Sequence, residues 1–393
     1  MPSDQRYSGE RREREIDEAL EATFPASDPF TLPTIMDGTA RSGISGGHSE
    51  NRPHRLPKQS DFREAPLQQP IDTGFGAMTT AEEVMGGRDL HGRTAIVTGG
   101  YSGLGLETVR VLAAAGARVV VPARNIGKAR GALARLEGME LGSVDLLDPA
   151  SIDAFAHGFL ASKRPLHMLI NNAGIMAPPL VRDGRGYESQ FSANHLGHFQ
   201  LALRLWPALV RAAGARIVAV SSRGHRLGNV DFEDPNFDRK PYERWMAYGQ
   251  SKTANVLFAV EADRRGEVDG IRAFAVHPGT ILSDLSRHLG EDDLKAFGVS
   301  RSDPKGHIPQ GQGVGDGGIF KTIAQGAATT VWCATSPLLA GKGGVYCEDG
   351  DIAGISHFAD PRVPGVHPWA IDPGAAASLW SISEFLIGAD RHP

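Results

Sequence analysis

The sequence is poor in cysteine, in long apolar runs and in net charge, and each shortage excludes a class of protein. Only two cysteines, Cys333 and Cys347, occur in 393 residues. They are too few for a disulfide framework and lack metal-site spacing, so we expect small buried or surface residues in a reducing compartment. A formal net charge of -5 implies no nucleic acid or other polyanionic partner. No run of roughly 18 apolar residues predicts a membrane span, and the charged N-terminus has no apolar secretory segment. We therefore expect a cytoplasmic protein without a metal site.

The chain divides into two unequal parts, residues 1–88 and residues 89–393. In the first part, apolar residues at helical spacing predict one short amphipathic helix near residues 10–24. Residues 37–76 are rich in Gly, Ser, Pro, Arg and His and have no apolar period, so we expect a largely disordered N-terminal extension. This extension is either a solvated tail or a docking helix on a flexible tether.

From about residue 89, short β-branched runs alternate with helical patterns. Each run is expected to be a buried strand, and the helices between them imply parallel strands with both sheet faces covered. The expected strands are Thr94–Thr98, Arg118–Pro122, His167–Asn171, Arg216–Ser221 and Ile271–His277. The pattern predicts an α/β fold with one doubly wound parallel sheet, whose ligands bind at the carboxyl ends of the strands.

A glycine-rich turn follows the first expected strand and opens a helix. Gly99, Gly103 and Gly105 have the spacing Gly-x-x-x-Gly-x-Gly. Glycines let the backbone approach a pyrophosphate, and the helix N-terminus offers N–H donors. A dinucleotide is therefore expected here, although an ordinary tight turn is the alternative. The expected contacts are Thr98, Gly99, Ser102, Gly103, Leu104 and Gly105.

The end of the second expected strand bears on the choice of cofactor. It reads Ala123-Arg124-Asn125, where NAD-binding domains normally place a carboxylate for the ribose 2′-hydroxyl. No acidic residue stands there to repel a 2′-phosphate, and Arg124 can make a charge-assisted contact to one. We predict NADP(H) over NAD(H); the alternative is that Arg124 is a solvated strand-end arginine. Asp145, beside Leu146 at another expected strand end, could bind the adenine amino group or cap a helix.

Tyr248 and Lys252 are four residues apart on an expected helix, so their side chains lie side by side. A free tyrosine has a pKa of about 10 and would be a poor acid or base at neutral pH. A nearby cation lowers that pKa, which predicts Tyr248 as a general acid/base, and the lysine can also donate to a nicotinamide ribose. The alternative for such a pair is two solvated neighbours.

Two further polar positions fit the same chemistry. Ser221 and Ser222 end the strand that begins at Arg216, where a hydroxyl could stabilise charge developing on a substrate oxygen or simply cap the next element. Asn194 lies within an apparent helix. It could hold a water that relays protons toward Lys252, or it could be a satisfied core residue.

Together these residues resemble the short-chain dehydrogenase/reductase family over roughly residues 90–390. The resemblance implies a Rossmann-type single catalytic domain and a hydride transfer at nicotinamide C4. By motif it makes Tyr248 the general acid/base, with Lys252 tuning it and holding the ribose. It makes Ser222 the residue that polarises the carbonyl, and Asn194 the residue that orders the relay water. The remaining matched positions, implied to contact the cofactor, are Asp145, Leu146, Asn172, Ala173, Gly174, Pro278, Gly279, Thr280 and Ile281.

Within the family the chain is most similar to the retinol dehydrogenase and WW-domain-containing oxidoreductase branch, through Arg124, Asn194-His-Leu-Gly-His-Phe199 and Ala247-Tyr-Gly-Gln-Ser-Lys252. This branch implies a hydrophobic alcohol, aldehyde or ketone as substrate. The family implies a homodimer or homotetramer with the Tyr-Lys helix in its interface, and a substrate lid from about Leu282 to Lys321. Residues 311–318 there are glycine-rich and suit either a flexible lid or a disordered loop.

The expected function is an NADP(H)-dependent oxidoreductase. The alternative is a non-catalytic NADP(H)-sensing or scaffold protein that acts through its N-terminal tail. The presence of Ser222, Tyr248 and Lys252 together favours the enzyme, since a sensor need not keep all three. Residues 18–29 resemble a short bacterial motif, which suggests a bacterial source.

Overall fold

The computed structural model describes residues 68–281, 290, 293, 313–314, 318–319 and 321–389. The helix expected near residues 10–24, the tail up to residue 67 and most of the expected lid lie outside the described residues. Within the described ranges, none of the helices has the length and apolar character needed to cross a membrane. Cys333 and Cys347 are both buried free thiols.

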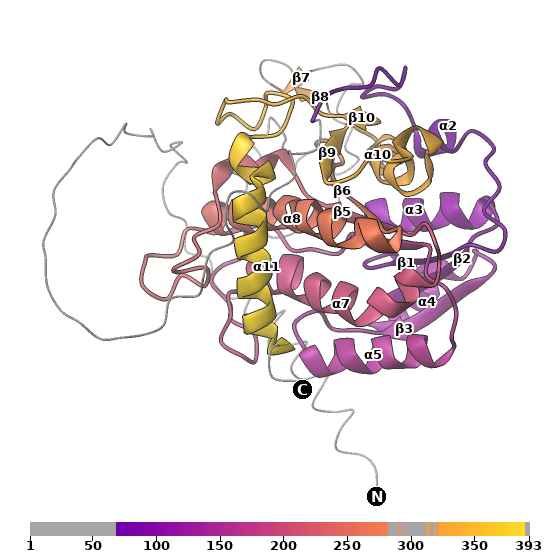
Figure 1. Cartoon of the computed structure of the whole chain (residues 1–393), viewed down its shortest axis with the longest axis horizontal. Helices are drawn as coiled ribbons and strands as arrows, with labels where there is room; N and C mark the ends of the chain where they lie inside the picture. Colours follow the sequence, from indigo (N-terminus) through magenta and orange to yellow (C-terminus); the bar gives the residue numbers. More distant parts are fainter. Residues whose placement is uncertain are drawn as a thin grey trace, which may run out of the picture.

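One eight-stranded sheet forms the centre of the domain, in the order β10-β9-β6-β5-β4-β1-β2-β3 (Figure 1). All neighbouring strands are parallel except the antiparallel pair β9 and β10. Strand order reverses between β1 and β4, which is the position where doubly wound sheets bind ligands. The strands are β1 (Thr94–Val97), β2 (Arg118–Ala123), β3 (Met139–Ser143), β4 (Met168–Asn171), β5 (Arg216–Val220), β6 (Arg272–His277), β9 (Val345–Glu348) and β10 (Asp351–Ile352). A separate short pair is β7 (Gly313–Val314) and β8 (Gly318–Ile319).

Helices cover both faces of the sheet because successive strand residues point to opposite sides. In β4, for example, Leu169 joins one apolar core and Ile170 joins the other. The Ile170 face is covered by α2 (Ala81–Met85), α3 (Gly103–Ala114), α4 (Ile126–Leu133) and α10 (Ile323–Thr335). The Leu169 face is covered by α5 (Pro149–Ala161), α7 (Gly197–Val210), α8 (Arg244–Gly266) and α11 (Pro373–Ile387). This arrangement confirms the expected doubly wound α/β fold.

Short helical turns connect these elements. They are α6 (Ser189–Phe191), the π-helical turn η2 (Ser192–Leu196), and the 3-10 turns η3 (Arg223–Leu227), η4 (Glu267–Asp269), η6 (Pro337–Leu339) and η7 (Pro368–Ile371). Several helix starts follow from single capping residues. Thr80 and Thr322 each form a capping box, at α2 and α10, and the Glu243 carboxylate accepts two N–H groups at the start of α8.

The folded part of the chain begins well before the expected boundary at residue 88. The Gln68 side-chain amide donates to the Tyr346 carbonyl (2.7 Å) and accepts the Tyr346 N–H (2.9 Å), so it extends the sheet edge. The Asp351 carboxylate accepts the backbone N–H groups of Ile71 (3.0 Å) and Thr73 (3.3 Å). Residues 68–88 therefore belong to the packed body of the domain. These polar contacts act together with the apolar side chains of α2, which are buried in the core on the Ile170 face.

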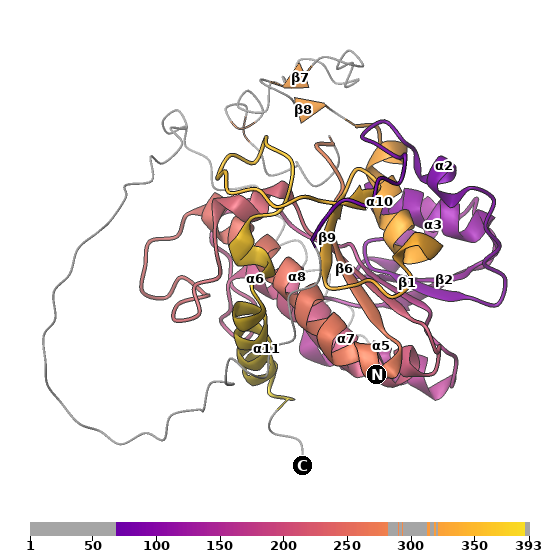
Figure 2. The same cartoon turned by 45° about the horizontal axis from the view of Figure 1, so that its top comes forward.

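The carboxyl ends of the parallel strands open on one edge of the sheet (Figure 2). The glycine turn follows β1, and Ser222 follows β5 by two residues. Pro278 follows β6 directly. Helix α8 brings Tyr248 to the same edge, and α11 lies across α8 on the outside of the domain (Figure 1). The fold thus collects at one edge the residues that the sequence separates by up to about 180 positions.

Candidate active site at the carboxyl edge of the sheet

The glycine turn after β1 has the backbone expected of a phosphate cradle. Gly99 has φ +64° and Gly103, the first residue of α3, has φ +47°, both in the region that favours glycine. Ser102 is the N-cap residue of α3, and its side chain makes no capping hydrogen bond. The first turn of α3 is therefore not closed by its own cap, and its N–H groups and helix dipole suit an anionic ligand.

Thr98 connects this turn to the Asn-Ala-Gly segment after β4. Its hydroxyl oxygen accepts the N–H groups of Asn172 (2.9 Å) and Ala173 (3.0 Å), and it is hydrogen bonded to His198 Nε2 (2.8 Å). The Asn172 side chain donates to the Thr98 carbonyl (2.9 Å). These hydrogen bonds hold the glycine turn after β1 next to the Asn-Ala-Gly segment after β4, and Thr98 connects the two.

Asn194 lies in the π-helical turn η2 and holds the next residues of that segment. Its amide accepts the Ile175 N–H (2.9 Å) and donates to the Ile175 carbonyl (3.0 Å) and to Ser251 Oγ (2.9 Å). A Cβ on Gly174 would lie 3.0 Å from Asn194 Oδ1 and 3.6 Å from Lys252 Nζ. Asn194, Gly174 and Lys252 therefore meet at one point, which the wide π turn makes possible.

Tyr248 and Lys252 are both buried on α8. Burial raises the pKa of Tyr248 to about 12, and a hydrogen bond with the Ser222 side chain lowers it. Burial lowers the pKa of Lys252 to about 8, and Lys252 Nζ donates to the Val220 carbonyl (3.0 Å). Nζ lies 5.7 Å from the centre of the Tyr248 ring. The expectation that Lys252 lowers the tyrosine pKa is thus not met in the protein alone, because desolvation of the phenol dominates.

Ser222 stands between the sheet and Tyr248. It is the N-cap of η3, and its hydroxyl oxygen accepts the Gly224 N–H (2.9 Å). A Cβ on Gly224 would lie 2.8 Å from Tyr248 Cε1 and 3.2 Å from Ser222 Oγ. Of the two serines, Ser222 is the one beside Tyr248, whereas the Ser221 hydroxyl donates to the Lys252 carbonyl (2.7 Å).

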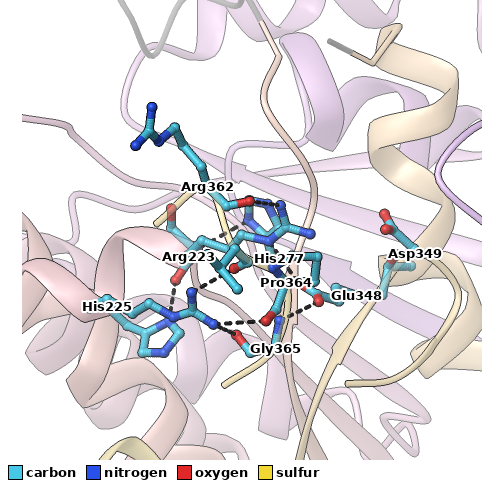
Figure 3. Close-up of polar contacts among 12 residues, drawn as sticks. Arg223, His225, His277, Glu348, Asp349, Arg362, Pro364 and Gly365 are labelled. Carbon is cyan, nitrogen blue, oxygen red and sulfur yellow. Dashed lines mark hydrogen bonds and ion pairs between the residues drawn. The ribbon is translucent and has the colours of Figure 1, made fainter. Parts of the chain in front are cut away.

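A polar network lies around Arg223, the residue after Ser222 (Figure 3). Arg223 Nε pairs with the Glu348 carboxylate (2.9 Å), which also accepts the Gly365 N–H (2.6 Å). The Arg223 N–H donates to His277 Nδ1 (3.2 Å), so the serine loop is tied to the residue before Pro278. Sequence reasoning missed this network. Its only local signals are the position of His277 beside the Pro-Gly pair and of His225 just beyond Ser222.

Four histidines around this edge are buried, and we call them the buried histidines. They are His195, His198, His225 and His277. Burial lowers the pKa of each, to about 3 for His195 and His225, to about 4 for His198 and well below the ordinary value for His277. All four are therefore neutral at neutral pH and can both donate and accept hydrogen bonds.

The expected adenosine-side residues lie at the ends of β2 and β3. Arg124 and Asn125 are exposed directly after β2, and Asn125 caps α4 by accepting the Lys128 N–H (2.9 Å). The Asp145 carboxylate accepts the N–H of Leu147 (2.9 Å). The sequence left open whether Asp145 caps a helix. The N-cap of the following helix, α5, is Asp148, so Asp145 does not have that role.

The expected nicotinamide-side residues lie after β6. Gly279 has φ +103° and faces the Lys321 side chain. A Cβ on Gly326 of α10 would lie 2.6 Å from Leu104 Cδ2 and 2.7 Å from Ile281 Cδ1. Leu104 of the glycine turn and Ile281 therefore contact the same point of α10, so the expected pyrophosphate turn and the expected nicotinamide segment lie next to each other.

Known proteins resemble this chain over most of the described region. A family model described as short chain dehydrogenase matches residues 93–294. A probable oxidoreductase of Streptomyces lividans is 47% identical over 307 residues, which cover 77% of this chain and 99% of the relative. Retinol dehydrogenase 12 of Homo sapiens is 36% identical over 76% of this chain and 87% of its own length. A solved structure of an uncharacterized protein from Mycobacterium paratuberculosis is 34% identical, with a TM-score of 0.58 over 77% of this chain and 95% of that chain. The resemblance inferred from the motifs is confirmed.

Proposed function

This chain belongs to the short-chain dehydrogenase/reductase family, and from that premise we propose that it transfers a hydride between NADP(H) and a hydrophobic alcohol, aldehyde or ketone, with Tyr248 as the general acid/base. The single observation that supports this chemistry most directly is the buried Tyr248 phenol, hydrogen bonded to Ser222 with Lys252 beside its ring. Those three groups converge at the carboxyl edge of the sheet.

The residues at this edge fit a dinucleotide. The uncapped first turn of α3 would take the pyrophosphate, and Ile281, which meets Leu104 at the same point of α10, would lie on the nicotinamide side. When bound, the nicotinamide ring would supply or accept the hydride. Arg124, exposed beyond β2 with no neighbouring carboxylate in the sequence, would favour a 2′-phosphate and hence NADP(H).

The proton is handled by the side chains of the chain itself. In the reducing direction, Tyr248 Oη donates its proton to the substrate oxygen, and the Ser222 hydroxyl hydrogen bonds to that oxygen as negative charge develops on it. With its pKa raised to about 12 by burial, the phenol carries its proton at neutral pH, and a positive charge on Lys252 beside its ring would favour release of that proton. Lys252 would hold the ribose, and Asn194 would order the relay water beside Gly174.

A panel of carbonyl substrates, followed by NADPH absorbance, tests the proposal. We expect Tyr248→Phe and Ser222→Ala to lose turnover by at least about 100-fold while cofactor binding remains. The matched control is Tyr346→Phe, because the Tyr346 hydroxyl is buried without a hydrogen-bond partner. Full activity in Tyr248→Phe would refute the proton-transfer role. Cofactor binding without turnover of any substrate by the unmodified protein would favour the sensing alternative.

Cofactor preference has its own test. We expect NADPH to be used in preference to NADH, and Arg124→Asp to reverse the preference by repelling the 2′-phosphate. Arg130→Asp carries the same charge change on α4 and should leave the preference unaltered. An unchanged NADPH-to-NADH ratio in Arg124→Asp would remove the basis of the NADP(H) assignment.

A further inference from the structure

Two buried histidines, His225 and His277, lie beside Arg223 (Figure 3), and they form hydrogen bonds with the peptide group that joins Ser222 to Arg223. His225 Nδ1 lies 2.7 Å from the Ser222 carbonyl oxygen. His277 Nδ1 accepts the Arg223 N–H at 3.2 Å. The carbonyl of the proposed catalytic serine and the following N–H are therefore both fixed by side chains.

The second nitrogen of His225 determines which way its hydrogen bonds run. His225 Nε2 lies 3.0 Å from the backbone nitrogen of His367, which can only donate. Nε2 must therefore accept and carry no proton, so a neutral ring carries its proton on Nδ1. Nδ1–H then donates to the Ser222 carbonyl, which can only accept. The neutral state agrees with the low pKa that burial gives His225.

The His367 N–H is itself held in place by the same network. Arg226 donates to four carbonyl oxygens of the preceding segment, those of Asp360 (2.7 Å), Val363 (2.6 Å), Pro364 (3.1 Å) and Gly365 (2.6 Å). The Glu348 carboxylate accepts the Gly365 N–H (2.6 Å). The segment that ends at His367 therefore presents its N–H to His225 from a fixed position.

We propose that His225 is a positioning residue for Ser222: the His367 N–H locks the ring as the Nδ1–H tautomer, and the ring in turn fixes the Ser222 carbonyl and the hydroxyl beside Tyr248. The proposal rests on the proposed role of Ser222. It places part of the control of that serine in residues 360–367, beyond the segment matched by the family model.

Removing one backbone N–H tests the lock without touching His225. His367 has φ -78°, which proline can adopt, and Val366 before it lies in an extended β-bridge. We expect His367→Pro to lower kcat roughly tenfold relative to His367→Ala, with the KM for cofactor unchanged. The alanine variant keeps the N–H and loses the same imidazole, so the pair isolates the hydrogen bond. Equal kcat in the two folded variants would overturn the proposal.

His225 itself is tested by replacement and by spectroscopy. His225→Leu removes both hydrogen bonds and should lower kcat at least as far, whereas His225→Gln can accept with its carbonyl, donate with its amide and restore most of the loss. Nitrogen-15 shifts of the His225 ring should report the Nδ1–H tautomer in the wild-type protein and its loss in His367→Pro. An Nε2–H tautomer in the wild type would overturn the assignment. The spectrum does not depend on turnover. It therefore tests the tautomer of His225 separately from the catalytic role of Ser222, which Ser222→Ala tests.

Discussion

Gly249, the residue after Tyr248, allows α8 to pack closely against η3, and a substitution there tests whether the reaction depends on that close packing. A Cβ there would lie 2.5 Å from the Gly228 nitrogen and 2.9 Å from the Gly224 carbonyl oxygen, and neither backbone atom can rotate away. Ordinary contact begins at 3.4 Å, so Gly249→Ala must move the helix and the turn apart by about 0.9 Å. Tyr248 lies on α8 and Ser222 directly precedes η3, so this movement would also separate Tyr248 from Ser222. A displacement near 1 Å in a reacting geometry can cost about 100-fold in rate.

We therefore expect Gly249→Ala to fold with a loss of about 1–3 kcal/mol of stability and to lose about 100-fold in kcat. The assay is steady-state turnover of the best substrate from the carbonyl panel, with unfolding by denaturant measured in parallel. Gly158→Ala on α5 is the control, since a Cβ there meets nothing within 4 Å and alanine favours the helix. A folded Gly249→Ala protein with kcat within about threefold of wild type would refute the reasoning.

Three further outcomes follow from buried contacts. Ser383→Ala should cost about 1–3 kcal/mol of unfolding free energy, because it leaves buried His195 Nε2 without its 2.8 Å partner; Ser381→Ala, exposed on the same helix, should cost almost nothing. Removal of residues 1–80 should give a lower thermal midpoint than removal of residues 1–67, because only the longer truncation removes the Gln68 hydrogen bonds. The buried histidines have folded pKa values below the ordinary 6.5, so between pH 6.5 and about 4 the unfolded chain binds protons that the folded chain does not. The free energy of unfolding is therefore at its full value above pH 6.5 and decreases as the pH falls toward 4. Denaturant titrations at pH 7 and 5 should show the loss, up to ~1.4 kcal/mol per pH unit for each histidine.

The central strands could be predicted because burial on both faces leaves a mark in each local sequence. Arg216–Val220, for example, has four consecutive residues that are all buried in the structure. The outer strands β9 and β10 leave no such mark, because β9 reads Val-Tyr-Cys-Glu and has one β-branched residue although all four positions are buried, and β10 has only two residues. Their pairing depends on register with β6 and on the Gln68 amide, which comes from 278 residues away. No local pattern can encode a contact of that kind.

The same distinction applies to the candidate site. Residues that follow a strand directly, such as Arg124 and Ser222, could be placed at the ligand edge because parallel strands end together. The π turn around Asn194 could not be predicted, because its hydrogen bonds to Ile175 and Ser251 form only after tertiary packing. The effect of burial on Tyr248 was missed for a related reason. Spacing reveals the neighbouring lysine but not the loss of solvent, and the loss of solvent dominates the pKa.

The packing of α11 on α8 bears on where a subunit interface would lie. The family resemblance places the Tyr-Lys helix in a subunit interface, whereas α11 covers α8 within the same chain. Trp380 of α11 stacks on Phe258 of α8 with 6.1 Å between ring centres. A homodimer or homotetramer remains a prediction, and its interface would use another face of the domain or would have to displace α11.

The reacting groups of the candidate site and the groups that hold them in place come from different parts of the chain. Tyr248, Lys252, Ser222 and Asn194 all lie within the segment that the family model matches. Several groups that hold their surroundings come from beyond it: Glu348 and the His367 N–H at the serine loop, and Ser383 at the histidine next to Asn194. Because these later groups supply hydrogen bonds rather than reacting atoms, their loss should disturb geometry while leaving the reaction type unchanged. The motifs of the family therefore identify the reacting groups of this chain, whereas the distances between those groups also depend on residues outside the motifs, such as Glu348, His367 and Ser383.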